Sequence, residues 1–170
     1  MLKQLHPAIA LGLIGLVTGI INHFIFLSNI HFSIYLLGSV IGLAVAAYLV
    51  IVWSRPLWAG FIIFAGCTLS WNAAVHSAVW IVVEFEIPDP QFWWVGGLTG
   101  SLGAVIFFAG FILAMSKPLV PVDLLRTVIV GMCAGTLTGL DMETGLVLFT
   151  IWQGAVAASL GRNRGVFDVG

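Results

Sequence analysis

The stretch from Leu57 to Met115 decides the fold, and it reads LWAGFIIFAGCTLSWNAAVHSAVWIVV-EFEIPDPQ-FWWVGGLTGSLGAVIFFAGFILAM. Its two apolar runs, Leu57–Val83 and Phe92–Met115, contain no charged residue. Each is longer than the roughly 20 residues that a helix needs to cross the hydrocarbon core of a bilayer. The connector between them, from Glu84 to Gln91, is short and acidic. The stretch therefore predicts two membrane-spanning helices joined outside the bilayer.

Composition extends this prediction to the whole chain. Of the 170 residues, 61% are hydrophobic and 8% are charged, whereas a soluble domain carries about 25% charged residues. A water-soluble fold is therefore excluded, and the absence of a basic patch excludes nucleic acid as a partner. Cys67 and Cys133 both fall in predicted membrane segments, so we interpret them as small buried thiols rather than as a disulfide or metal site.

On both sides of the hairpin, apolar runs alternate with short polar or proline-containing segments. This pattern predicts an all-α integral membrane protein. It forms a single domain, residues 1–170, whose six helices are expected at about 7–27, 32–53, 57–83, 92–115, 123–140 and 142–160. The first run is longer than the core of a signal peptide and lacks a cleavage site, so we expect it to be retained. The last two runs are at the short end for spanning. A re-entrant pair of half-helices is therefore the alternative there.

The positions of the charges predict the orientation. With six crossings, every basic residue lies on one side: Lys3, Arg55, Lys117, Arg126, Arg162 and Arg164. The acidic residues of the connectors lie on the other side: Glu84, Glu86, Asp89, Asp141 and Glu143. Because lysine and arginine gather in cytoplasmic loops, both termini are predicted to be cytoplasmic. The compact loops fit a bacterial inner membrane.

Clusters of small residues recur in alternate helices, at 15–19, 66–70 and 135–139. They are compatible with three helical hairpins repeated in one orientation, as in some transporters. Small residues also recur simply because helices in lipid pack closely through them. The sequence is compatible with both interpretations.

Neutral polar side chains within the predicted spans form the candidate pore or substrate lining. These residues are Asn22, His23, Thr68, Trp71, Asn72, His76, Thr138, Trp152 and Gln153. The set contains no carboxylate or ammonium group, so it suits a small polar solute better than an ion. Structural hydrogen bonds between helices are the alternative role for the same side chains.

His76 follows Asn72 by four residues, which places both on one face of a helix. Ionisable groups inside a membrane usually face a bundle interior and mark a function. His23 is expected at a similar depth in the first helix. Two histidines at one depth on different helices can bind a b-type haem as its axial ligands. An electron-transfer membrane anchor is therefore the second hypothesis. No other cofactor is expected.

The side that carries the acidic connectors is expected to form an outer vestibule. It would contain His31, Glu84, Glu86, Asp89, Asp141 and Glu143. Such a vestibule would attract cations, bind a divalent metal or respond to pH, because histidine titrates near neutrality. No metal motif of defined spacing is present. For Asp141 and Glu143 the alternative is capping of the last helix, where acids complement the helix dipole.

Two short segments resemble known six-helix channels. His6-Pro7-Ala8 with Gly12-Leu13 resembles the Asn-Pro-Ala-Pro-Leu-Gly-Leu opening of the acetate-uptake family, without its first Asn, and Trp152-Gln153-Gly154 resembles the last helix of the urea and amide channels. The resemblance implies a three-hairpin plan and transfers no site residue.

Catalytic signatures such as a nucleophile elbow, a zinc-protease helix or a phosphate loop are missing from the sequence, so an enzyme is not expected. The leading hypothesis is a small-solute channel or transporter, expected to be a homo-oligomer. The third hypothesis is a non-catalytic partner subunit of a larger membrane complex. It depends on a glycine-rich surface, Gly96 to Gly103, that would be poorly suited to face lipid.

Overall fold

The computed structural model describes residues 5–27, 33–88, 92–138 and 148–162, and this part of the chain is helical with no strand. Six α-helices and two short π-helical segments follow one another. They are α1 (Pro7–Leu27), α2 (Ser33–Ala47), η2 (Tyr48–Val52), α3 (Leu57–Glu84), α4 (Phe92–Met115), α5 (Pro121–Thr138), η4 (Leu148–Trp152) and α6 (Gln153–Leu160).

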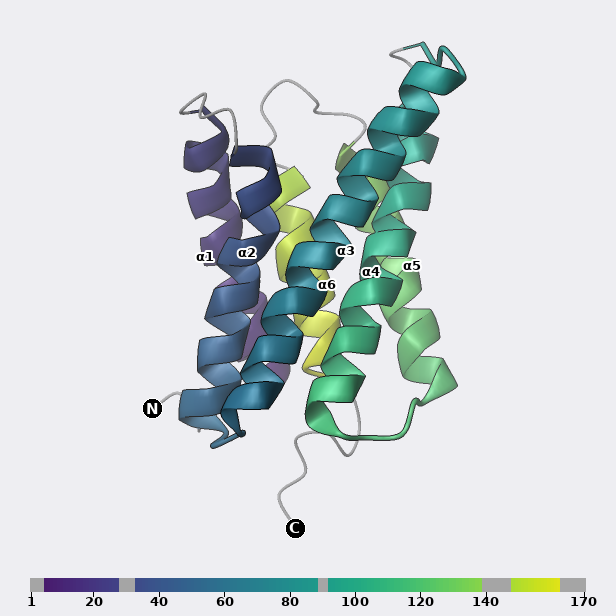
Figure 1. Cartoon of the computed structure of the whole chain (residues 1–170). Coiled ribbons are helices and arrows are strands. Elements are labelled where there is room, and N and C mark those ends of the chain that lie inside the picture. Colours follow the sequence, from purple (N-terminus) through teal and green to yellow (C-terminus); the bar gives the residue numbers. More distant parts are fainter. Residues whose placement is uncertain (1–4, 28–32, 89–91, 139–147, 163–170) are drawn as a thin grey trace.

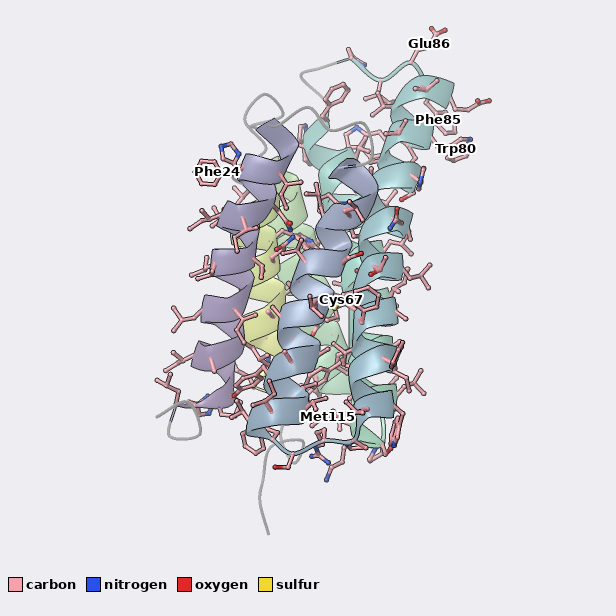
Figure 2. The ribbon with its side chains drawn as sticks, turned by 60° about the vertical axis from the view of Figure 1, so that its left-hand side comes forward. Phe24, Cys67, Trp80, Phe85, Glu86 and Met115 are labelled. Carbon is pink, nitrogen blue, oxygen red and sulfur yellow. The ribbon has the colours of Figure 1, made fainter. Side chains whose placement is uncertain are left out.

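The helices form one bundle in which each contacts the next along the chain, and α6 returns to pack along α1 (Figure 1). Gly161, which follows α6, packs against the backbone of Ala8. The end of α6 therefore lies beside the start of α1. Four basic residues, Arg55, Lys117, Arg126 and Arg162, lie at or near this end, which we call the basic end. Glu84 and Glu86 lie at the opposite, acidic end, at the projecting tip of α3 (Figure 2).

Three helices or helical segments end in the same way. Ser54, Glu86 and Ser116 have positive φ angles of 53°, 48° and 51°. A left-handed residue after a helix lets the following N–H groups bond to the last free carbonyls. The Ile87 N–H donates to Val82 O at 3.1 Å, and the Lys117 N–H donates to Ile112 O at 3.3 Å. A proline follows two residues after each left-handed residue, and it prevents the helix from continuing.

The predicted boundaries agree closely with the structure for the first four helices. The prediction of one helix over 32–53 missed the π-helical segment η2. The fifth helix begins at Pro121 instead of residue 123, because a proline is well tolerated in the first turn. In the last predicted helix, 142–160, the described part starts at Leu148 and its first turn is π-helical. Residues 139–147 lie outside the described residues.

Within the part of the chain that the structure describes, three segments are long and apolar enough to cross a membrane: Pro7–Ile25, Leu57–Glu84 and Phe92–Met115. Leu36–Val52 is a shorter apolar helix. Large apolar side chains are exposed along α1 to α5, for example Phe24 at 66%, Phe61 at 77% and Leu113 at 65%. In water, so much exposed apolar surface would cause aggregation. By contrast, no residue of α6 is exposed.

Glycines bring the helix backbones together. In the α4–α5 contact, an added Cβ at Gly135 would collide with Gly96 O, and one at Gly131 would collide with Ala104 Cβ. Glycine also allows close helix packing where Gly66 lies against Gly110, Gly42 against Cys67, and Gly12 against Ala158. The recurrent small residues therefore serve packing. Gly97, Gly100 and Gly103 are buried, so the third hypothesis loses its glycine-rich surface.

Candidate functional site

Five buried side-chain atoms have no hydrogen-bond partner among the described residues. They are Asn22 Oδ1, His23 Nδ1, Thr150 Oγ1, Trp152 Nε1 and Gln153 Nε2. All five belong to the second half of α1 or to η4 and the first residue of α6, two regions that pack against each other. Buried polar atoms are normally paired. We call these five residues and Thr18 the interior polar cluster.

Gln153 is one of two fully buried amides of the cluster. Its side chain is 0% exposed, and its Oε1 lies 3.1 Å from the hydroxyl oxygen of Thr18. That hydroxyl has a single hydrogen, which the carbonyl of Ile14 also accepts at 2.8 Å. Reversing the amide would let Nε2 donate to Thr18 and would place Oε1 where Nε2 now has no partner. In the orientation present, Nε2 is the unpaired atom of Gln153.

The backbone of α1 approaches this amide closely because Gly15 lies opposite it. A Cβ at Gly15 would collide with the backbone of Gln153 and Gly154. Thr18 follows Gly15 by three residues and Asn22 follows Thr18 by four, so the three lie on one face of α1. That face places both polar side chains toward the interior, where Thr18 is 4% and Asn22 0% exposed.

Asn22 connects α1 with α2. Its Nδ2 donates to Leu37 O at 2.9 Å. This bond fixes the amide orientation, because the reversed amide would place its oxygen against a carbonyl oxygen. The other atom, Oδ1, is buried and has no partner. Asn22 therefore presents a free acceptor to the interior.

Trp152 lies on the opposite side of the cluster, against α4. A Cβ at Gly100 would lie 3.3 Å from the indole Nε1, and one at Gly103 would lie 3.0 Å from Cζ2. The absence of side chains at both glycines makes room for the ring, which is 5% exposed. Ser70 lies nearby and donates to Gly103 O at 2.6 Å. The indole N–H of Trp152 remains a donor without an acceptor.

Neighbouring residues at the junction of η4 and α6 face different helices. Trp152 ends η4 and Gln153 begins α6. Consecutive helical residues point about 100° apart, so Gln153 reaches α1 while Trp152 reaches α4. Single π-helical turns such as η4 are rare and occur frequently at functional sites. Two adjacent residues therefore place polar atoms against two different helices.

Other predicted lining residues lie at the α2–α3 contact and do not join the cluster. Thr68 is 3.2 Å from the Ser39 hydroxyl and donates to Phe64 O at 2.9 Å. Asn72 donates to the carbonyl of Thr68 at 2.8 Å, within its own helix. Trp71 is 4% exposed and packs on Leu37. Thr138 is the last residue of α5, and its side chain lies outside the described set.

The two histidines that would clamp a haem face different surroundings. His76 is exposed on α3. His23 is half-buried on α1, with its ring 5.8 Å from that of Phe24 in an edge-to-face arrangement. The helix α2 packs against both α1 and α3. Axial ligation needs both imidazoles to face one shared space, so this donor pair does not fit a haem.

The predicted vestibule is described only in part. Glu84 and Glu86 are both exposed at the acidic end (Figure 2). His31, Asp89, Asp141 and Glu143 lie outside the described residues. Within the described ranges, no group of three or more histidine, cysteine or acidic side chains could hold a metal ion. Cys67 is buried, whereas Cys133 is exposed on α5. The interpretation of both thiols as buried was therefore wrong for Cys133, which points away from the packed face of its helix.

A second group of polar contacts lies near the basic end. Asp123 is 4% exposed, and the Arg126 guanidinium lies 3.3 Å from its carboxylate. The hydroxyls of Thr127 and Ser159 are 3.3 Å apart between α5 and α6. Pairing of this kind stabilises a helix contact, and these groups are satisfied. The spacing of Asp123 and Arg126 already indicated an ion pair, but the Thr127–Ser159 contact had no sequence signal.

No family model, curated protein or solved structure gives a match to this chain. The short resemblance to acetate-uptake and amide channels is therefore not accompanied by a family match.

Proposed function

We propose that this chain is a membrane-embedded channel or transporter for a small neutral polar solute. The observation that carries the proposal is the interior polar cluster, with five buried polar atoms left without partners inside a bundle of apolar outer surface. In a purely structural interior, each such atom costs about 1–3 kcal/mol. A passing solute or water would satisfy these atoms.

The proposal includes six membrane crossings with both termini in the cytoplasm, in a bacterial inner membrane. The three long apolar segments support it, as does α5, whose Gly135 reaches Gly96 only one turn from the start of α4. An α5 of that reach favours a full crossing over a re-entrant half-helix. The separation of Arg55, Lys117 and Arg162 from Glu84 and Glu86 supports the orientation.

Cysteine labelling tests the orientation. In a Cys133→Ala background, Glu86→Cys should react with a membrane-impermeant maleimide added outside intact cells. Arg162→Cys should react only after the cells are opened. Labelling of both positions from the same side would rule out the six-crossing arrangement.

Solute flux tests the function. The protein is reconstituted in liposomes, and stopped-flow light scattering measures the entry of glycerol and of other small alcohols and amides. We expect the parent to accelerate entry of at least one solute over empty liposomes. Gln153→Leu and Trp152→Phe should reduce that acceleration roughly tenfold or more, because each removes a donor from the interior.

Asn72→Ala is the matched control. It removes a half-buried amide outside the interior polar cluster, whose Nδ2 donates to Thr68 O within α3, so flux should be retained. The same flux in the parent and in Gln153→Leu, or no flux of any solute in the parent, would contradict the proposed function.

A further inference from the structure

We infer that the interior polar cluster selects solutes that are uncharged and that both donate and accept hydrogen bonds, with polyhydroxyl compounds as the best-fitting class. This inference rests on the proposed function and specifies its substrate. It follows from the kinds of atoms left without partners in the cluster. Trp152 Nε1 is a donor, and Asn22 Oδ1 is an acceptor.

Two of the three remaining atoms, on Thr150 and Gln153, can pair with a hydroxyl group in either role. The Thr150 hydroxyl both donates and accepts. Gln153 offers a donor in one amide orientation and an acceptor in the other. A hydroxyl group can form a hydrogen bond with each of these atoms, because it carries one hydrogen and two lone pairs. A solute that only accepts would leave Asn22 Oδ1 unsatisfied.

The same set rejects ions. Five of the six residues in the cluster are Thr18, Asn22, Thr150, Trp152 and Gln153, and none of them carries a charge. The sixth, His23, is half-buried beside Phe24. A charged solute that loses its hydration needs an opposite charge or a dense set of dipoles in return. The cluster supplies neither, so both cations and anions are excluded.

The experiment observes the indole N–H of Trp152 directly. The full chain is prepared in lipid nanodiscs with ¹⁵N-labelled tryptophan indoles, and Trp152→Phe assigns the resonance. Three solutes that share a three-carbon frame are titrated: glycerol, its amine analogue serinol as a cation, and glycerate as an anion. We expect glycerol to shift the Trp152 signal in a saturable way and the two charged solutes to leave it unchanged.

Two variants separate binding from folding. Asn22→Ala removes the acceptor and should weaken glycerol binding roughly tenfold, whereas Asn72→Ala should not change it. If Asn22→Ala fails to fold, Thr150→Val provides the second test, because it removes a hydroxyl from η4 while nearly keeping the side-chain shape. Retained affinity in the folded variant would overturn the assignment.

The outcomes distinguish the substrate class from the function. A saturable Trp152 shift without glycerol flux would support the site and contradict transport. Flux without such a shift would support transport and overturn this site. A shift of all indole signals together, or an equal response to serinol or glycerate, would also overturn the inference.

Discussion

The α4–α5 contact and the contact of α1 with η4 and α6 are both built on glycine, yet they treat polar groups differently. On α4 and α5, the hydroxyls of Thr99, Ser101 and Thr136 donate to carbonyls of their own helices at 2.9, 2.8 and 2.9 Å. On α1 and α6, Thr18 and Gln153 bond across the contact, and several nearby polar atoms have no partner. Close helix packing therefore does not require unpaired polar groups.

This difference is the reason why we propose that the contact of α1 with η4 and α6 carries the function. Unpaired buried atoms lower the stability of a protein, and such local violations are expected at functional sites. A contact that satisfies every hydroxyl within its own helix is explained by packing alone. We therefore expect substitutions at the α4–α5 contact to change stability and substitutions at the α1–α6 contact to change flux.

The largest expected effect is on stability, at Gly135. Gly135→Val should lower the free energy of unfolding by about 3 kcal/mol or abolish folding, since the added atoms collide with Gly96 O. Unfolding in detergent or bicelles, followed by circular dichroism, measures it. Ala109→Val is the control on the exposed face of α4 and should stay within about 0.5 kcal/mol of the parent. Equal stability of Gly135→Val and the parent would contradict the packing role.

The next effect separates function from stability. Gln153→Leu should abolish most of the flux while leaving the free energy of unfolding unchanged or raised by up to about 1 kcal/mol. The reason is that the change removes the unpaired Nε2, while the Thr18 hydroxyl keeps its hydrogen bond to Ile14 O. Thr99→Val, on the satisfied side of the comparison, should change neither flux nor stability appreciably. A strongly destabilised Gln153→Leu would show that Gln153 is a structural residue.

The smallest effect concerns the end of α4, on the packing side. Ser116 has a φ of 51°, a conformation that glycine adopts without strain. Ser116→Gly should therefore raise stability by about 0.4–1 kcal/mol and leave flux unchanged. Thermal unfolding and the flux assay measure the two quantities. Ser33→Gly provides a matched serine-to-glycine exchange at the start of α2 and should not stabilise.

The apolar runs predicted the helices well because bilayer length and prolines determine where they begin and end. The predicted 92–115 helix is α4 itself. The direction in which a side chain faces was harder to predict. When nearly every residue of a helix is apolar, the pattern carries little information about the buried face. His76 and Asn72 were therefore expected in the interior, whereas His76 is exposed.

The sequence also did not predict the two π-helical segments η2 and η4. Nothing in the sequence of Leu148–Trp152 marks it as π-helical. Trp152 and Gln153 were both predicted as lining because polar groups are rare in membrane spans. Their opposite orientations, and the choice of Asn22 over Asn72 as the cluster amide, depend on three-dimensional packing.

Hydrogen exchange of two tryptophan indoles tests most directly whether water and solute reach the interior polar cluster. Trp152 and Trp71 are 5% and 4% exposed, so simple burial predicts equal protection. If water and solute reach the interior polar cluster, the Trp152 indole proton should exchange with solvent at least about tenfold faster than that of Trp71 in nanodiscs. Equal or slower exchange at Trp152 would mean that the cluster is dry and would contradict the account.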